Sequence, residues 1–95
     1  MYIPNAFSPD GDGINDFFSV FSDSKATRLK SLAIYDRWGN LLFQSYDLPL
    51  NQPERGWNGT TSSGVRVPTG TYIYKVEVEL LNEKTELMTG VVQVF

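Results

Sequence analysis

The strongest constraint on the fold is the alternation of side chains along Thr71–Leu80. Successive side chains of a β-strand point to opposite faces of a sheet, so a period of two separates the faces. One face carries Tyr72, Tyr74, Val76, Val78 and Leu80, and the other carries Ile73, Lys75, Glu77 and Glu79. An antiparallel sheet with one packed face and one solvated face has this pattern. Helical periodicity is absent along the chain, which predicts an all-β protein.

Turn residues connect this strand to a partner and separate a second hairpin. The turn Asn82-Glu83-Lys84, with Asn82 able to tolerate a positive φ, predicts a return strand over Thr85–Phe95. The second hairpin is predicted over Leu29–Asp36 and Leu41–Tyr46, with Gly39 in the left-handed region of a type I turn and bulge.

Further short strands complete the predicted sheet structure. They are expected at Tyr2–Phe7, Phe17–Phe21 and Val65–Val67, with a loop over Asp47–Gly64. About seven short strands with frequent turn signals predict a β-sandwich. A chain of 95 residues is expected to form a single domain, residues 1–95.

Composition excludes several classes of function. The chain has no histidine and no cysteine, which removes the usual general base, the usual zinc ligands and disulfides. Its net charge is −3 and its basic residues are scattered singly, so we expect no nucleic-acid partner. No apolar run is long enough for a transmembrane helix. The start does not resemble a signal peptide, so we expect Met1 to be an added start residue on an excised domain.

An acidic segment near the N-terminus is a candidate metal site. Asp10, Asp12 and Asp16 lie within seven residues, with Asn15 beside them. Oxygen ligands on alternate residues of a glycine-containing loop are typical of calcium sites. The match to an EF-hand loop is partial, because no bidentate Glu stands at Ser19. The alternative is a solvated turn in which Asp and Asn side chains hydrogen-bond their own backbone.

Two tryptophans stand in turn-rich segments. We expect Trp57 to plug one end of the sandwich while its indole N–H donates to a loop carbonyl; the alternative is an aromatic platform for sugars. Trp38, at a hairpin tip, either packs over a neighbouring strand or is exposed as a contact residue. Asp36 and Arg37 flank this tip and are candidates for an ion pair.

Four ordered motifs carry a resemblance that covers nearly the whole chain. They are Ile3–Asp16, Ile34–Asn40, Trp57–Gly59 and Pro68–Tyr74. Together they resemble the gliding-motility-associated C-terminal domain of Bacteroidetes, the type B sorting signal of the type IX secretion system. The chain departs from that pattern at Asp10, where Asn is more usual. Its end on a strand at Phe95 is expected for a family that occupies the last residues of its parent proteins.

The resemblance implies a fold, a function and partners. The fold is an immunoglobulin-like antiparallel β-sandwich of about seven short strands. The function is a C-terminal secretion signal that takes an upstream passenger to the cell surface or medium. The implied partners are the type IX translocon and a PorP/SprF-like outer-membrane β-barrel protein. Within the motifs, Phe7, Pro9 and Trp38 are the candidate partner-binding residues.

Other classes of protein fit the sequence less well. A structural module, such as the immunoglobulin-like domain of flagellar hook-capping proteins, shares the Trp57–Gly59 and Pro68–Tyr74 patterns but does not require the acidic segment. A carbohydrate-binding module predicts a row of exposed aromatics, whereas the alternation places most aromatics in the core. An enzyme would have only unsupported carboxylates for its chemistry.

Overall fold

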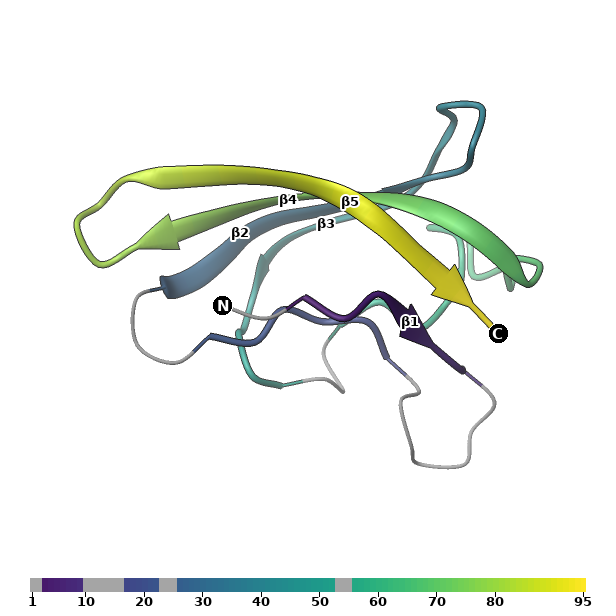
Figure 1. Cartoon of the computed structure of the whole chain (residues 1–95), viewed down its shortest axis with the longest axis horizontal. Helices are drawn as coiled ribbons and strands as arrows, with labels where there is room; N and C mark the ends of the chain where they lie inside the picture. Colours follow the sequence, from purple (N-terminus) through teal and green to yellow (C-terminus); the bar gives the residue numbers. More distant parts are fainter. Residues whose placement is uncertain (1–2, 10–16, 23–25, 53–55) are drawn as a thin grey trace.

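The alternating segment forms the central strand of a five-stranded sheet (Figure 1). The computed structural model describes residues 3–9, 17–22, 26–52 and 56–95. Its strands are β1 (Ala6–Phe7), β2 (Ala26–Tyr35), β3 (Leu41–Leu48), β4 (Gly70–Leu80) and β5 (Thr85–Val94), in the spatial order β1-β5-β4-β2-β3. Within the described ranges there is no helix, and hence none long and apolar enough to cross a membrane. The all-β prediction is confirmed.

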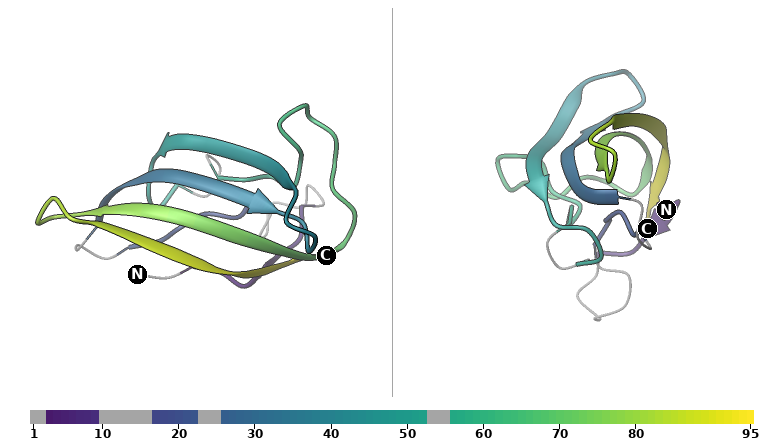
Figure 2. Two further views of the ribbon diagram at one scale, coloured as in Figure 1. Left: turned by 90° about the horizontal axis from the view of Figure 1, so that it is seen from above. Right: turned by 90° about the vertical axis from the view of Figure 1, so that its left-hand side faces the viewer.

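The sheet is antiparallel except at one edge. β5, β4, β2 and β3 pair antiparallel, and β1 pairs parallel with β5 at Ala6 and Phe7. The parallel pairing of β1 is the exception to the antiparallel sandwich expected from the sequence. Viewed end-on, the sheet curls into an open arc, and the end of β5 lies beside β1 (Figure 2).

The apolar face of β4 forms the centre of the core. Val76 and Val78 are fully buried and Tyr72 is nearly so, while Tyr74 is half-buried and packs against the core. The predicted face is thus the packed one. Among the residues that the structure describes, the other members of the buried core include Phe7, Phe18, Val20, Leu29, Leu32, Ala33, Ile34, Trp57, Val67, Val92 and Val94.

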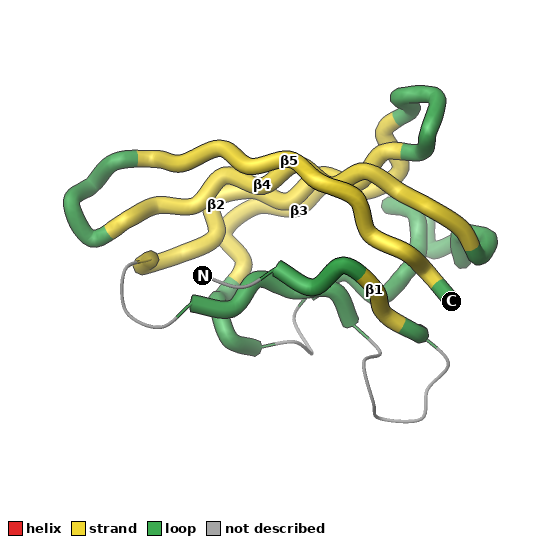
Figure 3. The backbone as a smooth tube through the Cα atoms, in the orientation of Figure 1, coloured by secondary structure: helices red, strands yellow, loops and turns green. Residues whose placement is uncertain are grey.

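A second layer covers this face, but it consists mainly of extended segments without regular strands (Figure 3). Residues 17–22 and 56–57 meet at one isolated bridge, where Phe18 and Trp57 exchange backbone hydrogen bonds of 2.7 and 2.8 Å. Phe18, Ser19 and Val20 are all buried, so this segment lacks the alternation of a strand with one solvated face. The strand predicted at Phe17–Phe21 is therefore reduced to single bridges.

The other predicted short strands are also reduced within the described residues. Of the strand predicted at Tyr2–Phe7, the structure describes β1, Ala6–Phe7. Val65–Val67 shortens to one bridge between Arg66 and Thr60. The described residues thus form five strands in one sheet, which does not confirm the predicted count of about seven.

Both predicted hairpins are present, with differences in detail. Gly39 has a φ of 86°, and its N–H donates to the Asp36 carbonyl at 3.1 Å, which confirms the left-handed position in the turn. Both strands of this hairpin are longer than predicted. In the β4–β5 turn the positive φ belongs to Glu83, at 66°, whereas Asn82 accepts a hydrogen bond from the Lys84 N–H through its side chain.

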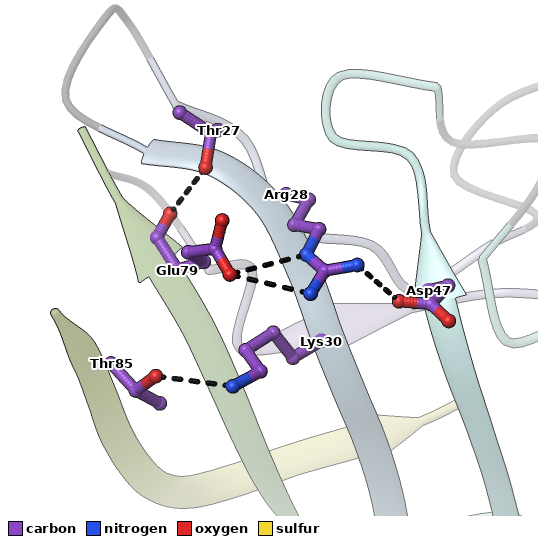
Figure 4. Close-up of polar contacts among 6 residues, drawn as sticks. All are labelled: Thr27, Arg28, Lys30, Asp47, Glu79 and Thr85. Atoms are coloured by element: carbon purple, nitrogen blue, oxygen red, sulfur yellow. Dashed lines mark hydrogen bonds and ion pairs between the residues drawn. The ribbon is translucent and has the colours of Figure 1, made fainter. Parts of the chain in front are cut away.

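The far end of the sheet, away from the Gly39 turn, carries a polar network (Figure 4). The Arg28 guanidinium donates to Asp47 Oδ1 at 2.8 Å and to Glu79 Oε2 at 3.3 Å, so it links β3, β2 and β4. Lys30 donates to Thr85 Oγ1 at 3.3 Å. These side chains are partly exposed, and such ion pairs contribute at most about 1 kcal/mol each. The network helps to align the strands at an end without signature motifs.

Candidate recognition site

Trp57 is the residue around which the motifs assemble. Its side chain is fully buried, and its ring centroid lies 5.3 Å from that of Phe7 and 6.1 Å from that of Tyr72. Its Nε1–H donates to the Thr60 carbonyl at 2.7 Å. The predicted structural role of Trp57 is confirmed, and a sugar platform at this residue is excluded because the ring has no exposed face.

The start of the acidic segment is anchored to the Trp57–Gly59 motif. Pro9 is buried, and a Cβ built on Gly59 would come within 2.9 Å of Pro9 Cγ. Gly59 has a φ of 86°, so this close approach coincides with a turn that favours glycine. The Arg66 guanidinium donates a hydrogen bond to the Pro9 carbonyl. Asp10, Asp12, Asn15 and Asp16 themselves lie outside the described residues, so calcium binding stays a prediction.

The hairpin tip is held by the Asp36 carboxylate. Its Oδ1 accepts hydrogen bonds from the N–H groups of Trp38 and Asn40, both at 2.9 Å, and its Oδ2 accepts from Asn40 Nδ2 at 3.0 Å. The side-chain and backbone hydrogen bonds from Asn40 hold the pKa of Asp36 below its usual value. Both oxygens of the Asp36 carboxylate therefore accept hydrogen bonds within the turn.

Arg37 does not form the expected ion pair with Asp36. Its guanidinium instead lies over the Trp38 ring, 4.5 Å from the ring centroid. The ion pairs found within the described ranges all involve Arg28. A guanidinium over an indole face is a favourable cation–π geometry that also restricts the rotamers of both side chains. The prediction of an Asp36–Arg37 ion pair was wrong.

A shallow hollow lies between the hairpin tip and the corner that precedes β4. It is lined by Asp36, Arg37, Trp38, Pro68, Thr69, Gly70, Thr71 and Tyr72. The Tyr72 hydroxyl donates to the Pro68 carbonyl at 2.5 Å and ties the corner to the strand. Burial, and secondarily the negative charge of Asp36, raise the pKa of Tyr72. The tyrosine therefore remains a neutral hydrogen-bond donor at physiological pH.

The hollow was not predicted from the sequence. Its two walls are separate motifs, Ile34–Asn40 and Pro68–Tyr74. The pairing of Tyr35 with Ile73 brings the end of β2 and the start of β4 together. The hollow could have been predicted only from this strand register. The register depends on contacts between residues far apart in the sequence.

The three candidate partner-binding residues, Phe7, Pro9 and Trp38, have different environments. Phe7 is 2% exposed and Pro9 is buried, which favours a structural role for both in the packing around Trp57. Trp38 is 74% exposed and occupies the tip of a well-ordered turn. Of these three residues, only Trp38 offers a large apolar side chain to a partner.

The motifs therefore form one packed unit and one exposed hairpin tip. Comparison with known protein families shows which family carries them. Residues 1–94 match the CHU_C type IX secretion signal domain. The chain belongs to this family. A search of curated proteins found no match.

As a type IX secretion signal domain, the chain directs the protein that carries it through the type IX secretion system. It is thus part of an exported protein and interacts with the secretion machinery. The family is not a catalytic one, and the match does not favour the alternative of a flagellar hook-capping module.

Proposed function

We propose that the secretion machinery recognises this signal domain at the hairpin end, through Trp38 and the adjacent hollow. The partners would be the type IX translocon and a PorP/SprF-like outer-membrane β-barrel protein, and the passenger would reach the cell surface or medium. The observation that carries the proposal is the 74% exposure of Trp38 on a turn that Asp36 holds rigid.

Energetic reasoning supports Trp38 as the contact. Tryptophan is enriched among the residues that dominate binding energy in protein interfaces. A side chain already restricted by Arg37 and by the turn loses little conformational entropy on binding. The hollow beside it has the polar Thr69 in its lining, which offers a hydrogen-bonding group next to an apolar anchor.

We also propose that the domain has no catalytic activity and that it has an immunoglobulin-like sandwich arrangement. The absence of histidine and cysteine from the whole sequence supports the first point. The second is supported by the two layers, in which Phe18 and Trp57 of the extended segments share one core with the buried residues of the sheet.

The experiment fuses residues 2–95 to a reporter with an export signal, in cells with and without an intact type IX system. Trp38→Ala is compared with Tyr46→Ala, because Tyr46 is an exposed aromatic on β3 away from the hollow. We expect Trp38→Ala to lower export by about tenfold or more, as for a hot-spot residue. Tyr46→Ala should leave export unchanged.

The folded state of each fusion is checked by circular dichroism of the isolated domain. Periplasmic retention of the unmodified fusion in competent cells containing the matching barrel would overturn the sorting role in this context. Normal export of Trp38→Ala would leave the sorting role intact and place recognition on another surface.

A further inference from the structure

Among the described residues, the outer edge of β5 is paired only near the end of the strand. The N–H of Gln93 donates to the Asn5 carbonyl at 2.9 Å, and that of Phe95 donates to the Phe7 carbonyl at 3.1 Å. Backbone groups alternate in direction along a strand, and β4–β5 pairing has no register shift. The N–H and C=O groups of Leu87, Thr89 and Val91 therefore point to the same side as those of Gln93.

No β1 residue pairs with this stretch within the described part of the chain. Figure 1 shows that β1 lies beside β5 only near the end of that strand. The backbone edge at Leu87, Thr89 and Val91 is thus a template onto which another extended chain can add.

This stretch lacks the usual features that protect a sheet edge. Leu87–Val92 contains no charged residue and no proline. The opposite edge, β3, has Asp47 near its end and Pro49 after it, and its Leu42 carbonyl accepts a hydrogen bond from Ser62 at 3.0 Å. Charges, prolines and loop cover are common means of blocking edge-to-edge association. In the described part of the chain, none of these features protects the stretch Leu87–Val91 of β5.

The side chains on the solvent face of this edge are also apolar. Leu87 is 55% exposed and Val91 is 51% exposed, with Thr89 between them on the same face. An antiparallel copy of β5, related by a twofold axis at Thr89, would place each Leu87 opposite Val91 of the other copy. The edge is therefore complementary to itself in both side chains and backbone.

We propose that β5 pairs with β5 of a second copy of this chain, antiparallel and centred on Thr89. Because Leu87, Thr89 and Val91 all direct backbone groups outward, this register makes Thr89–Thr89 and Leu87–Val91 hydrogen-bonded pairs. The result is one continuous sheet across two copies. The inference does not depend on the proposed recognition through Trp38, which lies on the β2–β3 turn.

β1 limits the length of the pairing. It already occupies the edge at Gln93 and Val94, so the second strand is confined to the stretch around Leu87–Val91. So short an interface lies well below the ~1,200 Å² typical of stable complexes, and we expect a weak dimer with a Kd on the order of 100 µM.

The test is sedimentation velocity of the 95-residue chain from about 10 µM to 1 mM. Leu87→Lys should raise the dimer Kd by about tenfold, because two apolar cross-strand pairs are lost. The control is Leu81→Lys, an exposed leucine in the β4–β5 turn outside the pairing, which should leave the Kd unchanged. Circular dichroism confirms that each variant is folded.

A double variant tests the register itself. In the proposed pairing, Leu87→Lys combined with Val91→Glu places a lysine opposite a glutamate at both ends of the interface, and association should recover to within about threefold of the wild type. A wild type that remains monomeric at 1 mM would overturn the proposal. So would equal effects of Leu87→Lys and Leu81→Lys, or a double variant that associates less than the single one.

Discussion

At the residue scale, Val76 shows how strictly the interior depends on one face of β4. It is fully buried at the centre of the sheet, between neighbours on β2 and β5. Val76→Asp places an unpaired carboxylate there, at an expected cost of several kcal/mol. Domains of this size are stable by about 5–10 kcal/mol, so the variant should be largely unfolded or close to it.

Val65→Asp provides the matched control for this prediction. It makes the same chemical change at an exposed position outside the core. Thermal and urea unfolding of both variants gives the comparison, and we expect a shift of no more than about 0.5 kcal/mol for Val65→Asp. Similar stability of the two variants would contradict the assignment of the buried face.

The lowered pKa of Asp36 predicts that the stability contributed by the hairpin tip depends on pH. Its pKa is lowered by the hydrogen bonds from Asn40 and Trp38, so the folded state favours the ionised carboxylate. The resulting stability is complete above the unfolded-state pKa of about 3.9 and is lost as pH falls through the lower folded-state pKa. The difference in Tm between wild type and Asp36→Ala should therefore be largest near neutral pH and shrink in acid.

The measurement is a series of melting curves, together with an NMR titration of Asp36. Replacing Asn40 by Ala should raise the pKa of Asp36 toward its ordinary value, because the largest cause of the shift is removed. A Tm difference that stays constant from neutral to strongly acidic pH would show that the carboxylate charge does not stabilise the turn.

The acidic segment makes a separate prediction about calcium. If Asp10, Asp12, Asn15 and Asp16 provide ligands, millimolar calcium should raise the Tm above that in a chelator, and Asp12→Ala should abolish the difference. A hundredfold excess over Kd would stabilise the native state by about 2.7 kcal/mol. Identical wild-type melting curves in calcium and in chelator would assign the segment to the solvated turn.

At the scale of elements, the glycine in the β2–β3 turn and the glycine in the segment before β4 have different surroundings. Gly39 and Gly59 both have a φ of 86°, but a Cβ at Gly39 would meet no atom within 4 Å, whereas one at Gly59 would press against Pro9. We expect Gly39→Ala to cost about 1–2 kcal/mol, because an L-residue is strained in this region.

Gly59→Ala should cost more, because the steric conflict with Pro9 adds to the same backbone strain. Urea unfolding of both variants measures the difference. An equal loss would mean that Pro9 yields easily, and that the start of the acidic segment is less firmly anchored than its burial indicates.

At the scale of the whole molecule, the signature motifs divide into an interior and a tip. Trp57, Phe7 and Tyr72 pack together inside, and Gly59 receives Pro9 from the N-terminal segment. Trp38 remains outside, on the turn at the same end. The described motif residues that pack inside thus stabilise the signal domain, and we propose that the exposed Trp38 makes the contact with the secretion machinery.

The sequence by itself determined the features that depend on short-range rules. The period-two pattern identified β4 and its buried face, and the turn residues located both hairpins and the left-handed Gly39. Both rest on backbone sterics and side-chain direction, which act within a few residues. The burial of Trp57 with a bonded indole N–H also followed, because a large aromatic with a polar group has few other stable environments.

Only the tertiary structure decided how segments distant in the chain meet. The strand predicted at Phe17–Phe21 is instead an extended segment, in which the consecutive residues Phe18, Ser19 and Val20 are buried and Phe18 pairs with Trp57. Likewise, the hollow beside Trp38 exists because β2 and β4 pair in one particular register. Within the described residues, β1 pairs with β5 only at Gln93 and Val94, which leaves the stretch around Thr89 unpaired there. These features arise from contacts between residues far apart in sequence, whose energies no local pattern records.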